Sequence, residues 1–201
     1  RIGGQRHRLG VEVAAGDHGA VVGEDERVVG HRIGFTHEHQ GGVAQLTKSL
    51  AIAYAAAHPE RVERLVLVGA YAEGRMVRAA TPEAKAEALV DIDLARVAWR
   101  RHDDSFLQVF ASQFLPDAST AHRDAFTGLL RETTSADNGG RFLEQFAHID
   151  VRPLLGAVRC PTLVVHSRGD LRVPLDQARE LAAAIPDSRL VLLDSRNHLL
   201  T

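Results

Sequence analysis

The sequence has few of the features that mark secreted, membrane-spanning or nucleic-acid-binding proteins. It contains one cysteine, Cys160, which excludes an internal disulfide framework and is typical of a reducing compartment. No apolar run is long enough to cross a membrane, and no signal-peptide pattern opens the chain. The net charge of −2 and the pI near 6.6 indicate no basic surface for nucleic acid or anionic lipid. We therefore expect a cytoplasmic protein that binds neither nucleic acid nor a membrane, with Cys160 as a small core residue.

Residues 1–48 differ in composition from the rest of the chain. Ten of the 17 glycines lie in the first 42 residues, together with five of the 11 histidines. Short strands are conceivable at 11–15, 20–22 and 27–35, but pieces so rich in glycine bury little surface, so we expect this segment to be irregular or weakly ordered. A divergent start, a flexible arm and a segment translated out of frame all remain open as explanations.

The end of the chain has a clear alternation of strand, helix and strand. Residues 162–166 form a short β-branched run, typical of a strand buried on both faces, and lead into a loop that carries Asp170. Pro174 opens a helix with a single apolar face, and Pro186 ends it. A second buried strand at 190–193 then leads to Asn197 and His198. Carboxyl ends of parallel strands meet at one edge of a sheet, so Asp170 and His198 are predicted to lie together.

Asp170 and His198 have the residue types and the order of an acid–base pair. The carboxylate would hold one imidazole nitrogen and fix the tautomer, while the other nitrogen takes a proton from a hydroxyl and later returns it. Either residue alone could belong to an ordinary turn. Their combined position at strand ends, roughly 28 residues apart as a strand–helix–strand step requires, favours catalysis. Asp194 is nearer to His198 in sequence, but it lies at the exit of the strand and is not the preferred partner.

The middle of the chain reads as a helix, a strand and a long helical insertion. Residues 50–57 are apolar on every side and predict a buried helix, which Ser49 would cap, followed by a strand at 64–68. Residues 71–155 are helical, with segments predicted at 82–90, 92–100, 105–115, 121–131 and 140–148. Phe106, Val109, Phe110 and Phe114 are expected on one buried face. An insertion here would lie over the strand ends, where it can exclude water and shape a pocket.

Several stretches resemble one known family. GD-x-x-VP at 169–174, NH-L-L at 197–200 and AIAYAAAHPERVERLVLVG at 51–69 are similar to the second half of an α/β-hydrolase. FASQFLPDAS and RFLEQFAHIDVRPLL resemble the helical lid of a bacterial subfamily whose members occur alone or joined to LuxR-type or nucleotide-cyclase domains. The resemblance covers residues 49–201. It implies an α/β fold that is a partial α/β-hydrolase, in which a parallel sheet has flanking helices and a lid at about 71–155.

The resemblance also implies hydrolysis of an ester or related acyl bond in a small-molecule substrate, with Asp170 and His198 as catalytic residues and no cofactor. The family's G-x-S-x-G turn, which presents the serine nucleophile, is absent from this sequence, and its serine would fall at Gln45. Ser49 and Thr36 are weak alternatives. Because the nucleophile is missing, a second interpretation stays open, in which the chain is a non-catalytic sensor, an interaction domain or a truncated remnant of a hydrolase.

Two further expectations concern metals and partners. His37, Glu38 and His39, with His18 and His31 upstream, place several potential ligands in one segment, but their spacing matches no known metal motif, so no metal site is predicted. The strand that should pair beside the strand at 64–68 is not recognisable in the sequence. We therefore expect an exposed sheet edge through which two copies of the chain could form a homodimer.

Overall fold

The computed structural model describes residues 11–12, 21–22, 43–101 and 103–199. Within the first 42 residues it has two short strands, β1 (Val11–Glu12) and β2 (Val21–Val22), which pair in antiparallel fashion. The predicted strand at 27–35, Thr36 and the five N-terminal histidines lie outside the described residues. The three explanations for the N-terminal segment, a divergent start, a flexible arm and an out-of-frame segment, therefore all stay open.

A parallel three-stranded sheet organises the rest of the chain. Its order is β3 (Leu65–Val68), β4 (Thr162–Ser167) and β5 (Ser188–Leu193), with Val68 opposite Val165 and Thr162 opposite Ser188. The central strand β4 alternates buried and half-buried positions, as its β-branched sequence predicts. The prediction that the last strand is fully buried is wrong, because β5 is an end strand and its residues are mostly half-buried.

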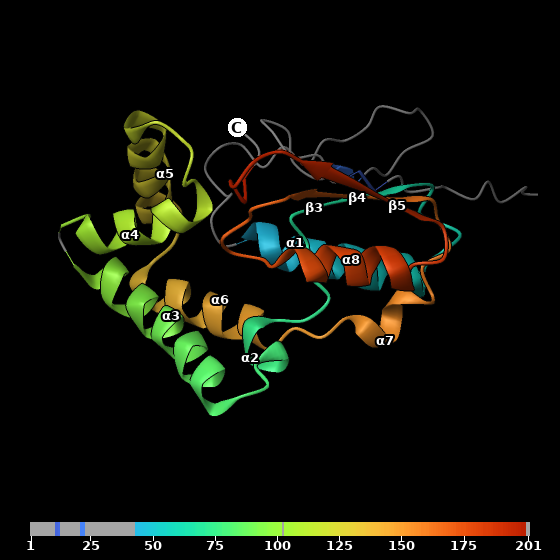
Figure 1. Ribbon diagram of the computed structural model, residues 1–201, viewed down its shortest axis with the longest axis horizontal. Helices are drawn as coiled ribbons and strands as arrows, with labels where there is room; N and C mark the ends of the chain where they lie inside the picture. Colours follow the sequence, from blue (N-terminus) through green and yellow to red (C-terminus); the bar gives the residue numbers. More distant parts are fainter. Residues whose placement is uncertain (1–10, 13–20, 23–42, 102, 200–201) are drawn as a thin grey trace, which may run out of the picture.

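Helices α1 (Val43–Ala57) and α8 (Leu175–Ala184) cover one face of this sheet (Figure 1). Between them and the sheet lies the main core, whose fully buried members include Ile52, Leu67, Val164, Leu181 and Ile185. Cys160 belongs to the same core, as predicted. Helix α1 begins seven residues before the predicted start, so Ser49 lies inside the helix and its assignment as an N-cap is wrong.

Between β3 and β4 the described residues form six helices, which lie mostly to one side of the sheet (Figure 1). They are α2 (Arg75–Arg78), α3 (Pro82–Arg100), α4 (Ser105–Phe114), α5 (Thr120–Thr133), α6 (Ala136–Ala147) and α7 (Arg152–Leu155). Hydroxyls of Thr81, Ser119 and Ser135 cap the three long helices α3, α5 and α6 by accepting backbone N–H groups of the first turn.

Two details of this helical segment correct the sequence prediction. The helices predicted at 82–90 and 92–100 are one continuous helix, α3, because nothing around Asp91 interrupts the backbone pattern. In α4 the buried residues are Leu107, Phe110, Ala111 and Phe114, whereas Phe106 is half-buried and Val109 is 52% exposed. The helix is therefore rotated from the predicted face, and it buries Leu107 and Ala111 in place of Phe106 and Val109.

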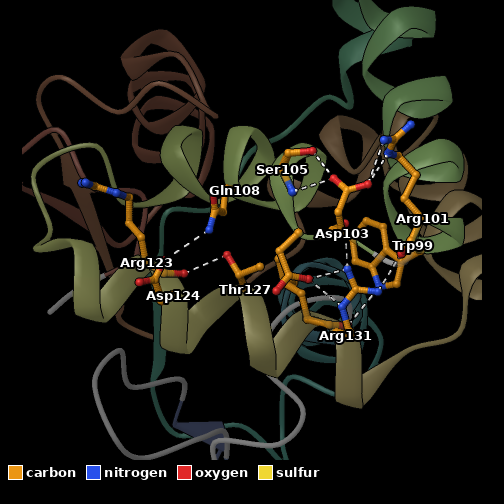
Figure 2. Close-up of polar contacts among 11 residues, drawn as sticks. Trp99, Arg101, Asp103, Ser105, Gln108, Arg123, Asp124, Thr127 and Arg131 are labelled. Atoms are coloured by element: carbon orange, nitrogen blue, oxygen red, sulfur yellow. Dashed lines mark hydrogen bonds and ion pairs between the residues drawn. The ribbon is translucent and has the colours of Figure 1, made fainter.

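The helices have a second hydrophobic core of their own, built from Phe110, Phe114, Phe126 and Leu130 with Trp99 packed against it. Polar contacts fix its rim (Figure 2). Arg131 of α5 donates to the Asp104 carboxylate (Nε–Oδ1 2.8 Å) and to the backbone carbonyls of Arg101 and Asp103. The Trp99 indole N–H donates to the Leu130 carbonyl at 2.9 Å. These bonds join α5 to the turn between α3 and α4.

The structure bears on two expectations, one about membrane-spanning helices and one about an exposed sheet edge. In the part of the chain that the structure describes, no helix is long and apolar enough to cross a membrane. Strand β3 forms the other end of the parallel sheet, and β1 lies near it without pairing to it among the described residues. Dimerisation through this edge stays a prediction.

The main core gives a direct test of the fold. Leu67 is fully buried at the centre of β3, so Leu67→Ala removes apolar contacts and leaves a cavity, which we expect to lower the free energy of unfolding by about 2–5 kcal/mol. Leu89→Ala is the matched control, because Leu89 is 50% exposed on α3 and its loss should cost less than about 0.5 kcal/mol. Urea unfolding of both variants measures the difference, and equal losses would contradict the described core.

Candidate active site

The loops after β4 and β5 leave the sheet side by side. Backbone bonds tie them together, since the Arg168 N–H donates to the Leu193 carbonyl at 2.9 Å and the Gly169 N–H to the Ser195 carbonyl at 3.0 Å. The first loop carries Asp170, and the second carries His198. The parallel pairing of β4 with β5 therefore brings two residues 28 positions apart to the same edge of the sheet.

Asp170 and His198 are in direct contact, as the sequence predicts. His198 Nδ1 lies 2.7 Å from Asp170 Oδ2, and both side chains are almost completely buried. The other carboxylate oxygen of Asp170 accepts the backbone N–H groups of Arg172 (2.7 Å) and Val173 (3.0 Å). This arrangement fixes the carboxylate from two sides and aims one oxygen at the imidazole.

Asp170 is held in its ionised form by these bonds. Burial alone would raise the pKa of its carboxyl group, but the hydrogen bond from His198 and the two backbone N–H groups stabilise the charged form more strongly. The net effect is a pKa of Asp170 below its ordinary value. Asp194, the alternative partner considered from the sequence, is exposed beyond the end of β5, and the imidazole is bonded to Asp170 instead.

Helix α4 fixes the loop that carries His198. The Phe114 carbonyl at the end of α4 accepts the His198 backbone N–H at 2.8 Å, and the Phe114 ring meets the imidazole edge-on with centroids 5.5 Å apart. Next to it, the Asn197 side-chain oxygen accepts the Asp117 N–H at 2.9 Å. The helical segment therefore helps to orient the imidazole, although it lies far away in the sequence.

Two residues on the sheet side complete the surroundings of His198. Gly69 follows β3 with φ +56°, a left-handed conformation that favours glycine, and a Cβ there would lie 3.0 Å from His198 Cε1. Lys48 of α1 is buried, and its Nζ donates to the Gly69 carbonyl at 3.3 Å. A long cationic side chain thus lies within α1, at a position where the turn of the resembled family has a small residue.

Burial controls the protonation of the His198 imidazole and the Lys48 ammonium group. It lowers the pKa of His198 to about 4; the hydrogen bond and charge of Asp170 oppose this shift, while the charges of Lys48 and Arg172 add to it. Burial also lowers the pKa of Lys48 to about 8, which the Asp170 carboxylate counteracts in part. At pH 7 the imidazole is therefore neutral, and because Nδ1 faces a carboxylate, its proton lies on Nδ1.

His166, at the end of β4, is a second histidine beside Asp170, and the sequence analysis did not single it out. Its Nε2 lies 3.0 Å from the Val173 carbonyl, to which it donates, and 3.7 Å from Asp170 Oδ2. Burial lowers the pKa of His166, so the ring is neutral and the longer contact is not an ion pair. Among the described residues, His166 Nδ1 and Ser167 Oγ are buried without hydrogen-bond partners.

The described residues do not supply the nucleophile in the family's manner. Ser49, one of the two weak candidates, lies half-buried within α1, and helical backbone replaces the sharp turn that would present it. Thr36, the other candidate, lies outside the described residues. No group of three metal-ligating side chains occurs within the described ranges, and the His37–His39 segment is not among them.

The sequence reading missed Gly69, Lys48, Phe114 and Arg172 as neighbours of the pair. Gly69 directly follows a predicted strand, and a glycine at a strand's carboxyl end is a signal for close backbone approach. Lys48 and Phe114 gave no such signal, because their contacts depend on how helices pack across long sequence separations. Asp170 and His198 themselves could be predicted from their positions at strand ends, their order and spacing, and the family resemblance.

Gly69 gives a test of this packing. Gly69→Ala forces a side chain into the left-handed region, costing about 1–2 kcal/mol, and presses Cβ against the imidazole. Gly128→Ala is the control, because a Cβ at that position in α5 meets open space and should stabilise the helix by about 0.5–1 kcal/mol. Chemical unfolding of the two variants should move in opposite directions. A fully stable Gly69→Ala protein would contradict the described conformation of Gly69 and its close approach to His198.

Comparison with known proteins identifies the family. The model of the alpha/beta hydrolase fold family matches residues 49–200. A 2-hydroxy-6-oxononadienedioate/2-hydroxy-6-oxononatrienedioate hydrolase from Cupriavidus pinatubonensis is 29% identical over 154 residues, which are 74% of this chain and 51% of the relative. A pimeloyl-(acyl-carrier protein) methyl ester esterase from Aromatoleum aromaticum is 32% identical over 160 residues, covering 74% of this chain and 62% of the relative.

Solved structures agree with these matches. An esterase from Exiguobacterium antarcticum aligns with a TM-score of 0.62 at 22% identity, covering 75% of this chain and 56% of that one. A hydrolase from Oleispira antarctica aligns with a TM-score of 0.63 at 16% identity, covering 76% and 55%. At such identities the likeness shows the fold. The chain spans about half to three fifths of the length of these relatives and structures. Because the family match covers most of the chain, the protein belongs to the alpha/beta hydrolase fold family.

Proposed function

We propose that this chain carries the acid–base half of an acyl hydrolase, with Asp170 and His198 as its catalytic pair. The observation that supports the proposal is the buried 2.7 Å contact between His198 Nδ1 and Asp170 Oδ2 at the carboxyl ends of two parallel strands. This edge of an open α/β sheet is the place where ligands bind. In this tautomer the imidazole proton is on Nδ1, so Nε2 is the nitrogen that would act as the base.

In the proposed reaction, His198 Nε2 takes the proton of a hydroxyl group as the oxygen attacks the acyl carbon. Electrons move to the carbonyl oxygen, and the ionised Asp170 stabilises the imidazolium that forms. When the carbonyl re-forms, the bond to the leaving group breaks, and the imidazolium returns its proton to that group. Water then releases the acyl group by the same two proton transfers. The hydroxyl nucleophile is not assigned, and Ser49 and Thr36 remain its weak candidates.

The substrate class comes from the relatives. One relative is named for hydrolysis of a 2-hydroxy-6-oxo dienedioate and another for a methyl ester, so an ester or related acyl bond in a small molecule is the substrate we propose here. We further propose that α2 to α7 act as the lid. Support comes from α4, whose end contacts both the backbone and the ring of His198, so a movement of this helix would reach the imidazole directly.

A second candidate function has its own support. His198 is only 2% exposed, and the buried Lys48 ammonium contributes to a pKa of about 4, which makes the imidazole a weak base at neutral pH. Lys48 also lies within α1, and the helix there leaves no sharp turn for a nucleophile. These features fit a non-catalytic hydrolase-like domain that senses a ligand or binds a partner.

An activity assay separates the two candidates. If the first is correct, the purified chain hydrolyses p-nitrophenyl butyrate, and His198→Ala lowers kcat/KM by about 10²–10⁴-fold because the general base is lost. His122→Ala is the matched control, since His122 is exposed on α5 and its removal should leave the rate unchanged.

Labelling with a fluorophosphonate adds the identity of the nucleophile. Under the catalytic proposal, mass spectrometry finds one modified hydroxyl, and the modification disappears in His198→Ala. A folded parent chain that neither hydrolyses the ester nor takes up the label would reject catalysis and favour the non-catalytic function. Circular dichroism of each variant establishes that the comparison is made between folded proteins.

A further inference from the structure

A cavity lies next to the Asp170–His198 pair, between α2, α3, α6 and the loop before α8. It is open to solvent, and its walls include Phe114, Arg172 and Val173. Phe114 also contacts the His198 ring, and the Val173 backbone N–H bonds to Asp170. The cavity and the catalytic pair therefore share walls, so one small molecule could reach both.

Three guanidinium groups line this cavity, those of Arg75, Arg78 and Arg172, against one carboxylate, that of Asp91. Arg172 is fully engaged, because it forms a two-bond pair with Asp91 (Nη1–Oδ1 3.0 Å and Nη2–Oδ2 2.9 Å) and donates to Gln113 at 2.6 Å. Arg75 reaches the same carboxylate at 3.3 Å. Three positive charges and one negative charge leave the cavity walls with a net charge of +2.

The other polar groups nearby do not cancel this charge. Arg78 donates to the backbone carbonyl of Glu73 at 2.9 Å, while the Glu73 carboxylate pairs with Arg152 at 2.9 Å. Tyr71 lines the cavity as a neutral phenol, because burial raises its pKa to about 12 and its hydroxyl donates to the Phe146 carbonyl. Glu87 lies near Arg75 but is exposed and outside the lining.

The two arginines that are not fully paired are partly removed from water. Burial lowers the pKa of Arg75, and the neighbouring Arg172 charge lowers it further; burial and the Arg75 charge do the same for Arg78. Each of these guanidinium groups uses one donor on a contact within the described residues, out of five N–H groups. An anion placed between them would therefore replace lost hydration and relieve the repulsion.

The remaining lining is apolar and comes from Ile92, Phe114, Leu143 and Phe146, with Ala88 and Ala147. A flat guanidinium fork matches a carboxylate in two parallel hydrogen bonds, and the apolar walls suit a short carbon chain. We infer that the substrate's acyl chain carries a carboxylate, which Arg75 and Arg78 bind while the scissile acyl group lies at His198. This inference rests on the function proposed above.

Binding measurements test the inference without requiring turnover. Isothermal titration calorimetry compares monomethyl adipate, a half-ester with one carboxylate, with dimethyl adipate, its neutral counterpart. We expect the half-ester to bind at least about 10-fold more tightly, because hydrogen bonds to charged groups are the strong ones. Arg78→Gln should remove most of this preference while leaving the affinity for the diester unchanged.

Arg179→Gln is the matched control, because Arg179 lies on α8, pairs with the exposed Asp176 and does not line the cavity. Its preference for the half-ester should equal that of the parent. If Arg78→Gln unfolds, Arg75→Gln takes its place. Equal affinity for the two esters, binding of neither, or a preference that survives both substitutions would overturn the inference. Anion binding without hydrolysis would leave it standing and count against the catalytic proposal alone.

Discussion

The buried hydrogen bond between Asp170 and His198 is the interaction on which the rest of the site depends. It exists because β4 and β5 run parallel and their loops are tied by backbone bonds before either residue is reached. Each partner is then fixed independently, Asp170 by two backbone N–H groups and His198 by the carbonyl of Phe114. Preorganisation of this kind lets a carboxylate orient an imidazole without further movement.

The burial that fixes the Asp170–His198 pair also lowers the basicity of His198. A base works best when its pKa is near the working pH, yet the surroundings of His198 favour the neutral ring so strongly that its pKa is about 4. Burial is the largest cause of this shift, and Lys48 of α1 adds to it, whereas a small residue at this position would carry no charge. The neighbouring cavity, which Phe114 also lines, has further positive charge from Arg75 and Arg78.

Much of the fold could be predicted from the sequence, because short-range patterns determine it. Pro174, Pro186 and the β-branched run of β4 set the order of the elements, and that order was enough to place Asp170 beside His198. The start of α1 and the buried face of α4 could not be predicted in this way. Both depend on packing between distant segments, which also explains why Lys48 and Phe114 were missed.

Nitrogen-15 NMR of the His198 ring between pH 3 and pH 9 tests the central claim most directly. If the imidazole is buried against Asp170, both nitrogens should show a neutral ring protonated on Nδ1 at pH 7, with a titration midpoint near pH 4. Asp170→Asn should lower the midpoint further, because the carboxylate raises the pKa of the imidazole. A ring that titrates near pH 6.5, in the parent and in Asp170→Asn alike, would contradict the account.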